Sequence, residues 1–209
     1  MRRQWKVLAV AAALLAIAGC SGMSASECEL ADWRAVGYED GSRGRSSEVF
    51  ASHRKNCAKH DIAPDFSAYQ SGRESGLREY CQPAKGFREG ARGAEYVGVC
   101  PADLENAFLD GYYEGRTLYQ LEYAVNSTTR QIEARQSRMK RIEIELTEVM
   151  AAALADDLPG DQRASLLVQT KQLAEERITL ANEVDDLQVQ LRTQQEELAA
   201  HRSQMVTRL

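Results

Sequence analysis

Two long apolar stripes of constant period occupy the last part of the chain, and they limit its fold more than any other feature. From Leu118 to Ala153, and again from Leu166 to Met205, stripe residues recur at alternating steps of three and four. This spacing keeps a narrow stripe on one face of a helix, which is typical of a coiled coil. The run DDLPGD at 156–161 separates the stripes and predicts a turn, because it contains adjacent proline and glycine.

The two stripes match each other across this turn. Their members are Leu118, Leu121, Val125, Thr128, Ile132, Arg135, Met139, Ile142, Leu146, Val149 and Ala153 before it, and Leu166, Thr170, Leu173, Arg177, Leu180, Val184, Leu187, Leu191, Gln194, Leu198, His201 and Met205 after it. If the turn reverses the chain, Ala153 lies opposite Leu166, and the two residue numbers of every such layer add up to 319. We therefore predict that 102–209 forms an antiparallel coiled-coil hairpin with arms roughly 65 Å long, at 1.5 Å per residue for about 45 residues. Association of separate chains into a homo-oligomer along the same stripes is the alternative.

The start of the chain predicts export. MRRQWK is followed by a short apolar run that ends in Ile17-Ala18-Gly19-Cys20, which indicates a signal sequence at 1–19. IAGC resembles the lipobox of bacterial lipoproteins, and this resemblance implies cleavage before Cys20, acylation of Cys20 (palmitate among its acyl chains) and membrane anchoring. In that family Asp after the cysteine retains the protein in the inner membrane, so Ser21 favours the periplasmic face of the outer membrane. Residues 20–27 would then form a short tether.

The charge balance argues against a nucleic-acid partner. The whole chain has a formal net charge of -5, and residues 102–209 contain 19 Asp and Glu against 12 Lys and Arg. Nucleic-acid binders normally carry a basic surface. We therefore expect a protein partner in the cell envelope, reached through the coiled coil.

Four cysteines remain after Cys20, namely Cys28, Cys57, Cys81 and Cys100. An even number in a short exported segment predicts disulfides, and three pairings are open from the sequence alone. Helices expected at about 29–44, 47–59 and 65–80 favour Cys28 with Cys57 and Cys81 with Cys100, because antiparallel neighbours bring these helix ends together. The glycine-rich stretch from Gln82 to Cys100 is expected to be a loop or a short hairpin.

The segment 28–101 is rich in glycine and aromatic residues and is expected to be a small helical domain, stapled by disulfides, with its motif reaching about residue 119. Three similar stretches, WRAVGYEDG, YQSGRESG and FLDGYYEG, place an aromatic residue before two glycines four apart. Glycines four apart lie on one helix face, where a second backbone can approach closely. Tight helix packing is the preferred interpretation. The alternative is a ligand groove lined by Trp33, Gly37, Gly41, Tyr69, Gly72, Gly76, Gly111 and Gly115.

Residues that suggest chemistry are few. His53, Cys57 and His60 share one helix face and could bind zinc, but a periplasmic Cys57 is expected to be oxidised, so no metal or other cofactor is predicted. Glu39 and Asp40, or Glu114 among Tyr112, Tyr113 and Tyr119, are the nearest acid–base candidates. Adjacent carboxylates usually mark a solvated face, and we predict no catalytic residue and no enzyme.

The motifs CxxxxW, GYEDGSRG, PDFSAYQSGRESGLREYC, GFREGARGAEYVGVCP and FLDGYYEG together resemble a family of proteobacterial lipoproteins catalogued as a domain of unknown function. The resemblance covers about Cys28 to Tyr119 and implies an exported envelope protein without an assigned activity. We expect a structural or scaffolding protein whose coiled coil contacts another envelope component. The alternative is a small-ligand or glycan binding module that uses the coiled coil as a spacer.

Overall fold

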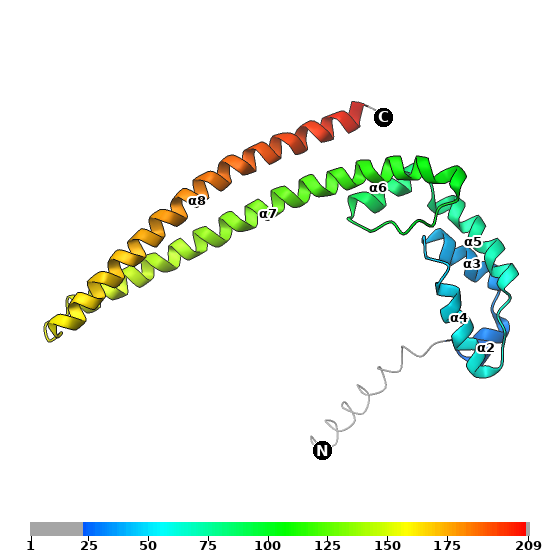
Figure 1. Ribbon diagram of the computed structural model, residues 1–209, viewed down its shortest axis with the longest axis horizontal. Helices are drawn as coiled ribbons and strands as arrows, with labels where there is room; N and C mark the ends of the chain where they lie inside the picture. The colour runs from blue at the N-terminus through cyan, green and yellow to red at the C-terminus, as the bar shows by residue number, and fades with distance from the viewer. Residues whose placement is uncertain (1–22, 208–209) are drawn as a thin grey trace, which may run out of the picture. The chain divides into compact units, whose positions relative to one another are not determined.

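The computed structural model describes residues 23–207 (Figure 1). Every regular element in this range is a helix, which confirms the predicted mainly α fold. The elements are α2 (Ala25–Leu30), α3 (Trp33–Ser42), α4 (Val49–Cys57), the short 3-10 helix η2 (Ala58–His60), α5 (Phe66–Tyr80), α6 (Pro83–Ala91), α7 (Ala102–Ala153) and α8 (Gly160–Thr207). The predicted signal sequence, Cys20 and Ser21 lie outside the described residues.

The chain divides into two compact units. The first contains the described residues up to Gly90 together with Ala94–Tyr113, and the second contains Ala91–Gly93 and the residues from Glu114 onward. The division falls within the long helix α7. No helix in the described range is both long enough and apolar enough to cross a membrane.

Side-chain caps define the starts of α3 and α5. Asp65 accepts a hydrogen bond of 2.9 Å from the Ala68 N–H and begins α5, as expected. Asp32 accepts from the backbone N–H groups of Arg34 and Ala35 and begins α3. The single helix expected over about 29–44 is therefore wrong, because the cap at Asp32 separates α2 from α3.

Paired glycines bring α3 and α5 into backbone contact. A Cβ added at Gly37 would overlap the carbonyl of Tyr69, and one added at Gly72 would overlap the carbonyl of Arg34. One helical turn further on, Gly41 and Gly76 stand in the same relation to the carbonyls of Arg73 and Tyr38, respectively. The two helices thus lie too close for any larger residue at these four positions.

The same arrangement recurs with α6 and α7. The sequence GYEDGSRG at 37–44 corresponds to GFREGARG at 86–93, and a Cβ at Gly86 or Gly111 would overlap the carbonyl of Phe108 or Pro83. The loop expected over this stretch is therefore wrong for Pro83–Ala91. Glycine lowers the local helix propensity, but the close approach to α7 compensates for it. The first unit thus contains two related helix pairs.

Each helix pair has its own disulfide and aromatic core. Cys28 is bonded to Cys57 and Cys81 to Cys100, which confirms the favoured pairing. The first disulfide packs with Trp33, Phe50 and Tyr69, and the second with Leu77, Tyr80, Phe108 and Tyr112. The disulfides supplement small cores that contain few aliphatic side chains.

The second unit contains the predicted antiparallel hairpin, in which α8 runs back along α7 (Figure 1). All predicted seam residues are buried or half-buried except Arg177. The side chain of Arg177 turns outward from its seam position and pairs with Glu143 at 3.1 Å. Its long side chain can leave the seam without breaking the helix.

Ion pairs between the arms agree with the predicted register. Arg135 was predicted to lie opposite Val184, and its Nε bonds the adjacent Glu183 at 3.1 Å. Arg138 donates two hydrogen bonds of 2.8 Å to Glu176 and one of 2.7 Å to Glu145. The bond from Arg138 lowers the pKa of Glu176. The contacts between the arms fix the register of α8 along α7.

Candidate functional site

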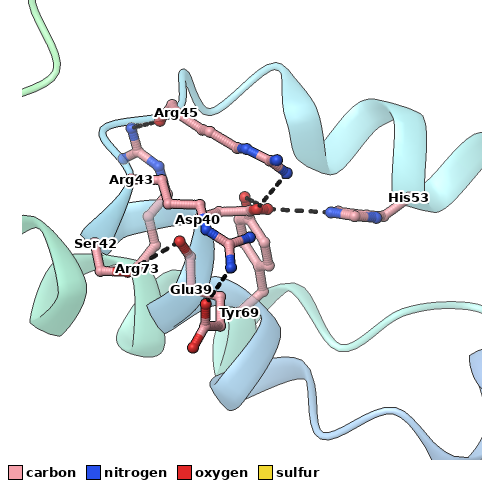
Figure 2. A network of polar contacts seen from close by, with 8 residues as sticks. All are labelled: Glu39, Asp40, Ser42, Arg43, Arg45, His53, Tyr69 and Arg73. Atoms are coloured by element: carbon pink, nitrogen blue, oxygen red, sulfur yellow. Dashed lines mark hydrogen bonds and ion pairs between the residues drawn. The ribbon is translucent and has the colours of Figure 1, made fainter.

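Asp40 is the centre of a buried polar network in the first unit. Its side chain is only 4% exposed, yet it carries a carboxylate. The Nη1 of Arg45 lies 3.1 Å from Oδ1, while Nε2 of His53 at 3.1 Å and the hydroxyl of Tyr69 at 3.0 Å both contact Oδ2. Figure 2 shows these three side chains converging on Asp40.

The three partners come from different segments. Asp40 lies on α3, Arg45 on the loop that follows it, His53 on α4 and Tyr69 on α5. A buried carboxylate without partners would cost several kcal/mol of desolvation, so these contacts hold the segments together. His53 donates to Asp40 in the tautomer that carries its proton on Nε2.

Tyr69 supplies the most deeply buried donor of the network, with 1% of its surface exposed. Burial, followed by the hydrogen bond and the negative charge of Asp40, raises the pKa of Tyr69 to about 12. The hydroxyl therefore keeps its proton at neutral pH and donates it to the carboxylate. This is opposite to the behaviour required of a general base, which must give up its proton near the working pH.

A second layer supports the network from α5. Nη2 of Arg73 donates to the backbone carbonyl of Arg45 at 2.9 Å, which anchors the loop after α3. In the second helix pair, Tyr112 donates to the equivalent carbonyl of Ala94 at 2.8 Å. The loop after the first helix of each pair is thus anchored through an equivalent carbonyl, by Arg73 in the first pair and by Tyr112 in the second.

The residues that form the acid–tyrosine bond differ at the equivalent places of the second helix pair. Phe108 has the place of Tyr69 and has no hydroxyl, while Glu89 has the place of Asp40. Glu89 is 6% exposed and pairs with Lys85 at 3.2 Å. The bond between Asp40 and Tyr69 therefore has no counterpart at position 108, where the hydroxyl is missing.

Aromatic rings enclose the network. The ring of Trp33 lies 6.0 Å from His53, and the ring of Phe50 lies 4.7 Å from Tyr69. A shallow open depression on this unit is lined by Met23, Ser26, Glu27, Leu30 and Ala31, none of which belongs to the network. The close contacts of Asp40 with Arg45, His53 and Tyr69 fit a structural role.

The two adjacent carboxylates of α3 behave differently. The side chain of Glu39 is 55% exposed and pairs with Arg43 at 2.8 Å, as expected for a solvated face. The same expectation is wrong for Asp40, which lies on the buried face with Trp33 and Gly37. Its spacing of three from Gly37 and seven from Trp33 is the sequence signal that identifies this face.

The other residues considered for chemistry also have structural contacts. Cys57 is bonded to Cys28 and fully buried, and His53 bonds Asp40, so neither is placed with His60 as a ligand set. No group of three His, Cys, Asp or Glu side chains within residues 23–207 is arranged to hold a metal ion. Tyr112 directs its hydroxyl to the carbonyl of Ala94.

The residues of the alternative ligand groove are covered. Trp33 and Tyr69 are core residues, and the glycines at 37, 41, 72, 76 and 111 face the backbone of a neighbouring helix. Gly115 is buried as well. The strip of glycines is filled by helix packing, which was the preferred interpretation of the sequence.

The exposed apolar residues of the second unit form a different kind of candidate site. Large apolar side chains that are more than half exposed are Tyr123, Ile144, Met150, Leu154, Leu167, Val168, Ile178 and Val189. The seam between α7 and α8 does not use them. Exposed apolar side chains that gather in one place are typical of a protein-binding surface.

Comparison with known proteins identifies only a family without an assigned activity. No curated protein and no solved structure matches the chain. The predicted resemblance to a family of unknown function is confirmed for residues 32–117, whereas the predicted motif and the lipoprotein character stay predictions. Residues 32–117 match the family described as "Protein of unknown function (DUF2799)".

Proposed function

We propose that this chain is a lipid-anchored scaffold protein of the bacterial cell envelope. Cys20 carries the lipid, the anchor lies in the periplasmic face of the outer membrane, and the hairpin of α7 and α8 binds another envelope component. The role is binding and not catalysis, because Asp40 and Tyr69 are enclosed and committed to each other.

The proposed location rests on the sequence and on the disulfides. IAGC at 17–20 follows a short apolar run, and Ser21 replaces the aspartate that would favour the inner membrane. Two disulfides, Cys28–Cys57 and Cys81–Cys100, fit an oxidising compartment such as the periplasm.

The outer surface of the hairpin carries the proposal of a binding role. Ile142 and Leu173 are buried in the seam, so the two arms bury these seam residues against each other within one chain. Leu154 and Leu167 nevertheless remain 77% and 59% exposed. Apolar side chains outside a complete seam support an interaction with a second molecule.

A truncation tests this role. A chain that ends after Tyr119 keeps both helix pairs of the first unit and the contact between Tyr119 and Gly93, but it lacks the hairpin. Partners are then purified from envelope fractions with the full and the shortened chain. Loss of the partner on truncation supports the scaffold, and retained binding favours the ligand-binding module. Intact disulfides and helical circular dichroism control for folding.

The anchor is tested separately. Cys20→Ala is expected to abolish palmitate labelling and to leave the protein unprocessed or soluble. Ser21→Asp is the matched control, because it should keep the label and move the protein to the inner membrane. A Cys20→Ala protein that still labels and fractionates with the outer membrane would contradict the proposal.

A further inference from the structure

Four exposed apolar residues gather at the closed end of the hairpin. Met150 lies in the last turn of α7, Leu154 directly follows that helix, and Leu167 and Val168 lie in the second and third turns of α8. Their exposed fractions are 54%, 77%, 59% and 56%, respectively. We name these four residues the tip patch.

Most of the tip patch lies on one edge of the hairpin. At the open end, Glu122 directly follows the seam residue Leu121, and Arg202 directly follows the seam residue His201. Glu122 and Arg202 form an ion pair of 2.7 Å. Positions directly after such seam residues therefore share an edge, as in other antiparallel coiled coils.

Met150 directly follows the seam residue Val149 and lies four heptads after Glu122. Leu167 directly follows the seam residue Leu166 and lies five heptads before Arg202. They therefore belong to the same edge, and Leu154 lies one turn after Met150 on the same face of α7. Charged residues occupy the opposite edge, where Arg138 binds Glu145 and Glu176. Met150 and Leu167 thus lie on the edge opposite to these ion pairs.

The turn below the tip patch is held in place. Arg163 donates hydrogen bonds to the carbonyls of Ala153 and Ala155, which closes the end of α7 against the start of α8. Ala153 is only 7% exposed, so the seam stays closed up to its last layer. The exposed side chains of the tip patch therefore do not result from an open end of the coiled coil.

Acidic residues border the tip patch. Glu148, Asp156, Asp157 and Asp161 are all exposed and form no ion pair within the described residues. Arg163 is the only cation between 148 and 163, and its guanidinium is already bonded to backbone carbonyls. Four acidic side chains therefore stand against one cation in 148–163, and the border has an excess of negative charge.

We propose that the tip patch docks a protein partner that presents an apolar stripe bordered by Lys or Arg. This inference rests on the proposed scaffold function and names the chemistry of its partner. Met150 and Leu154 at a spacing of four, beside Leu167, form an apolar face of the kind by which a helix packs on an apolar partner surface. The acidic border favours a partner whose apolar surface is bordered by basic residues, because opposite charges speed association and like charges oppose it.

A second copy of this chain is a poor occupant of the same surface. Joining two tip patches would bring Asp156, Asp157 and Asp161 of one copy close to the same residues of the other. Like charges at an interface disfavour the pairing. A different protein with a basic rim has no such repulsion.

The test uses the full chain in living cells. A photoreactive benzoyl-phenylalanine replaces Leu154, and matched probes replace Tyr123 and Val189, which are 57% and 55% exposed but lie away from the tip. The crosslinked peptide of the partner is sequenced by mass spectrometry. We expect a crosslink from 154 to one protein, at apolar residues flanked by Lys or Arg, and none from 123 or 189.

Two substitutions then test the chemistry in the chain with the probe at 154. Leu167→Glu should lower the crosslink yield by about tenfold or more, as expected for one buried leucine. Val189→Glu, at similar exposure, should leave the yield unchanged. Asp156→Asn, Asp157→Asn and Asp161→Asn together should lower the yield most clearly at low salt, where charge steering is strongest. Circular dichroism checks that the hairpin remains helical.

Several results would overturn the inference. Crosslinks from 123 or 189 but not from 154 would keep a scaffold and exclude the tip patch. A crosslink from 154 to a second copy of this chain, or to a segment without Lys or Arg, would exclude the proposed partner chemistry. No crosslink from any of the three positions would reject both the tip patch and the binding role of the hairpin.

Discussion

Replacing Gly72 with alanine is the sharpest perturbation of the helical first unit. The added Cβ would overlap the backbone carbonyl of Arg34, and the Cα of the same residue would also lie close to it. A backbone group cannot turn away as a flexible side chain can, so α3 and α5 must move apart. This movement would also shift Asp40 against Tyr69, which links the helices at 3.0 Å.

The expected loss of stability follows from two opposing effects. Overpacking a closely packed site costs about 1–3 kcal/mol, occasionally more, and a backbone clash belongs to the upper part of this range. Alanine in place of glycine within a helix stabilises the helix by about 1 kcal/mol. We expect a net destabilisation of about 2 kcal/mol, which lowers the urea midpoint by roughly 1 M for a slope near 2 kcal/mol per M.

Trp33 provides the assay. It is 7% exposed and its ring lies 6.4 Å from Phe50 in the core of the first helix pair, so its fluorescence reports unfolding of this unit. Ser71→Ala is the control, because Ser71 precedes Gly72 on α5 and is exposed. The control should change stability by less than about 0.5 kcal/mol. If Gly72→Ala instead stabilises the unit, helix propensity dominates and the close approach of α3 and α5 is refuted.

Three further predictions concern the polar network, a disulfide and the hairpin. The pKa of Tyr69 is raised to about 12 from its usual 10, so its contribution to stability is complete below pH 10 and is lost as the pH rises towards 12. Tyr69→Phe should lower stability at pH 7, measured by urea unfolding, and should weaken this alkaline loss; an unchanged pH profile would contradict the bond to Asp40. Replacing Cys28 and Cys57 with serine opens a loop of 29 residues and should lower stability by about 3–4 kcal/mol, with an unchanged urea midpoint as the contradicting result. Cysteines at Leu146 and Leu173 should form a disulfide within one chain at every protein concentration, whereas cysteines at Leu146 and Leu166 should not, because their Cα atoms would exceed the limit of about 7 Å; disulfide-linked dimers alone from the first pair would contradict the hairpin.

The hairpin could be predicted from the sequence because its information is local and repeated. A stripe of constant period, a turn with Pro159 and Gly160 and a matching second stripe determine the register together. Arg177 departs from the stripe because a long charged side chain can reach solvent and Glu143 from a seam position. One exception of this kind does not shift the register.

The helix α6 and the role of Asp40 were harder to predict because they depend on tertiary contacts. Gly86 lowers local helix propensity, and only the approach of α7 explains why a helix forms there. The repeat of GYEDGSRG as GFREGARG, 49 residues later, contains this information and indicates that both stretches are helices. For Asp40, the position relative to Gly37 and Trp33 identifies the buried face, but its donors come from segments distant in sequence.

The binding surface of the hairpin is a third case. Seam residues obey a rule because they must pack against each other, whereas residues outside the seam are free of this constraint. Leu154 and Leu167 therefore could not be distinguished from ordinary helix residues by the period alone. Only their exposure beside a closed seam separates them from the core.

The central claim is that the outer surface of the hairpin, and not the helical first unit, binds the envelope partner. A chain that keeps every seam residue but exchanges the exposed apolar residues from Tyr123 to Val189 for glutamine tests it directly. Copurification of the partner is measured from the outer-membrane fraction, with palmitate labelling, circular dichroism and Trp33 fluorescence as controls. We predict loss of the partner while lipidation, helix content and the first unit stay intact. Unchanged copurification from such a chain would contradict the claim and assign binding to the first unit.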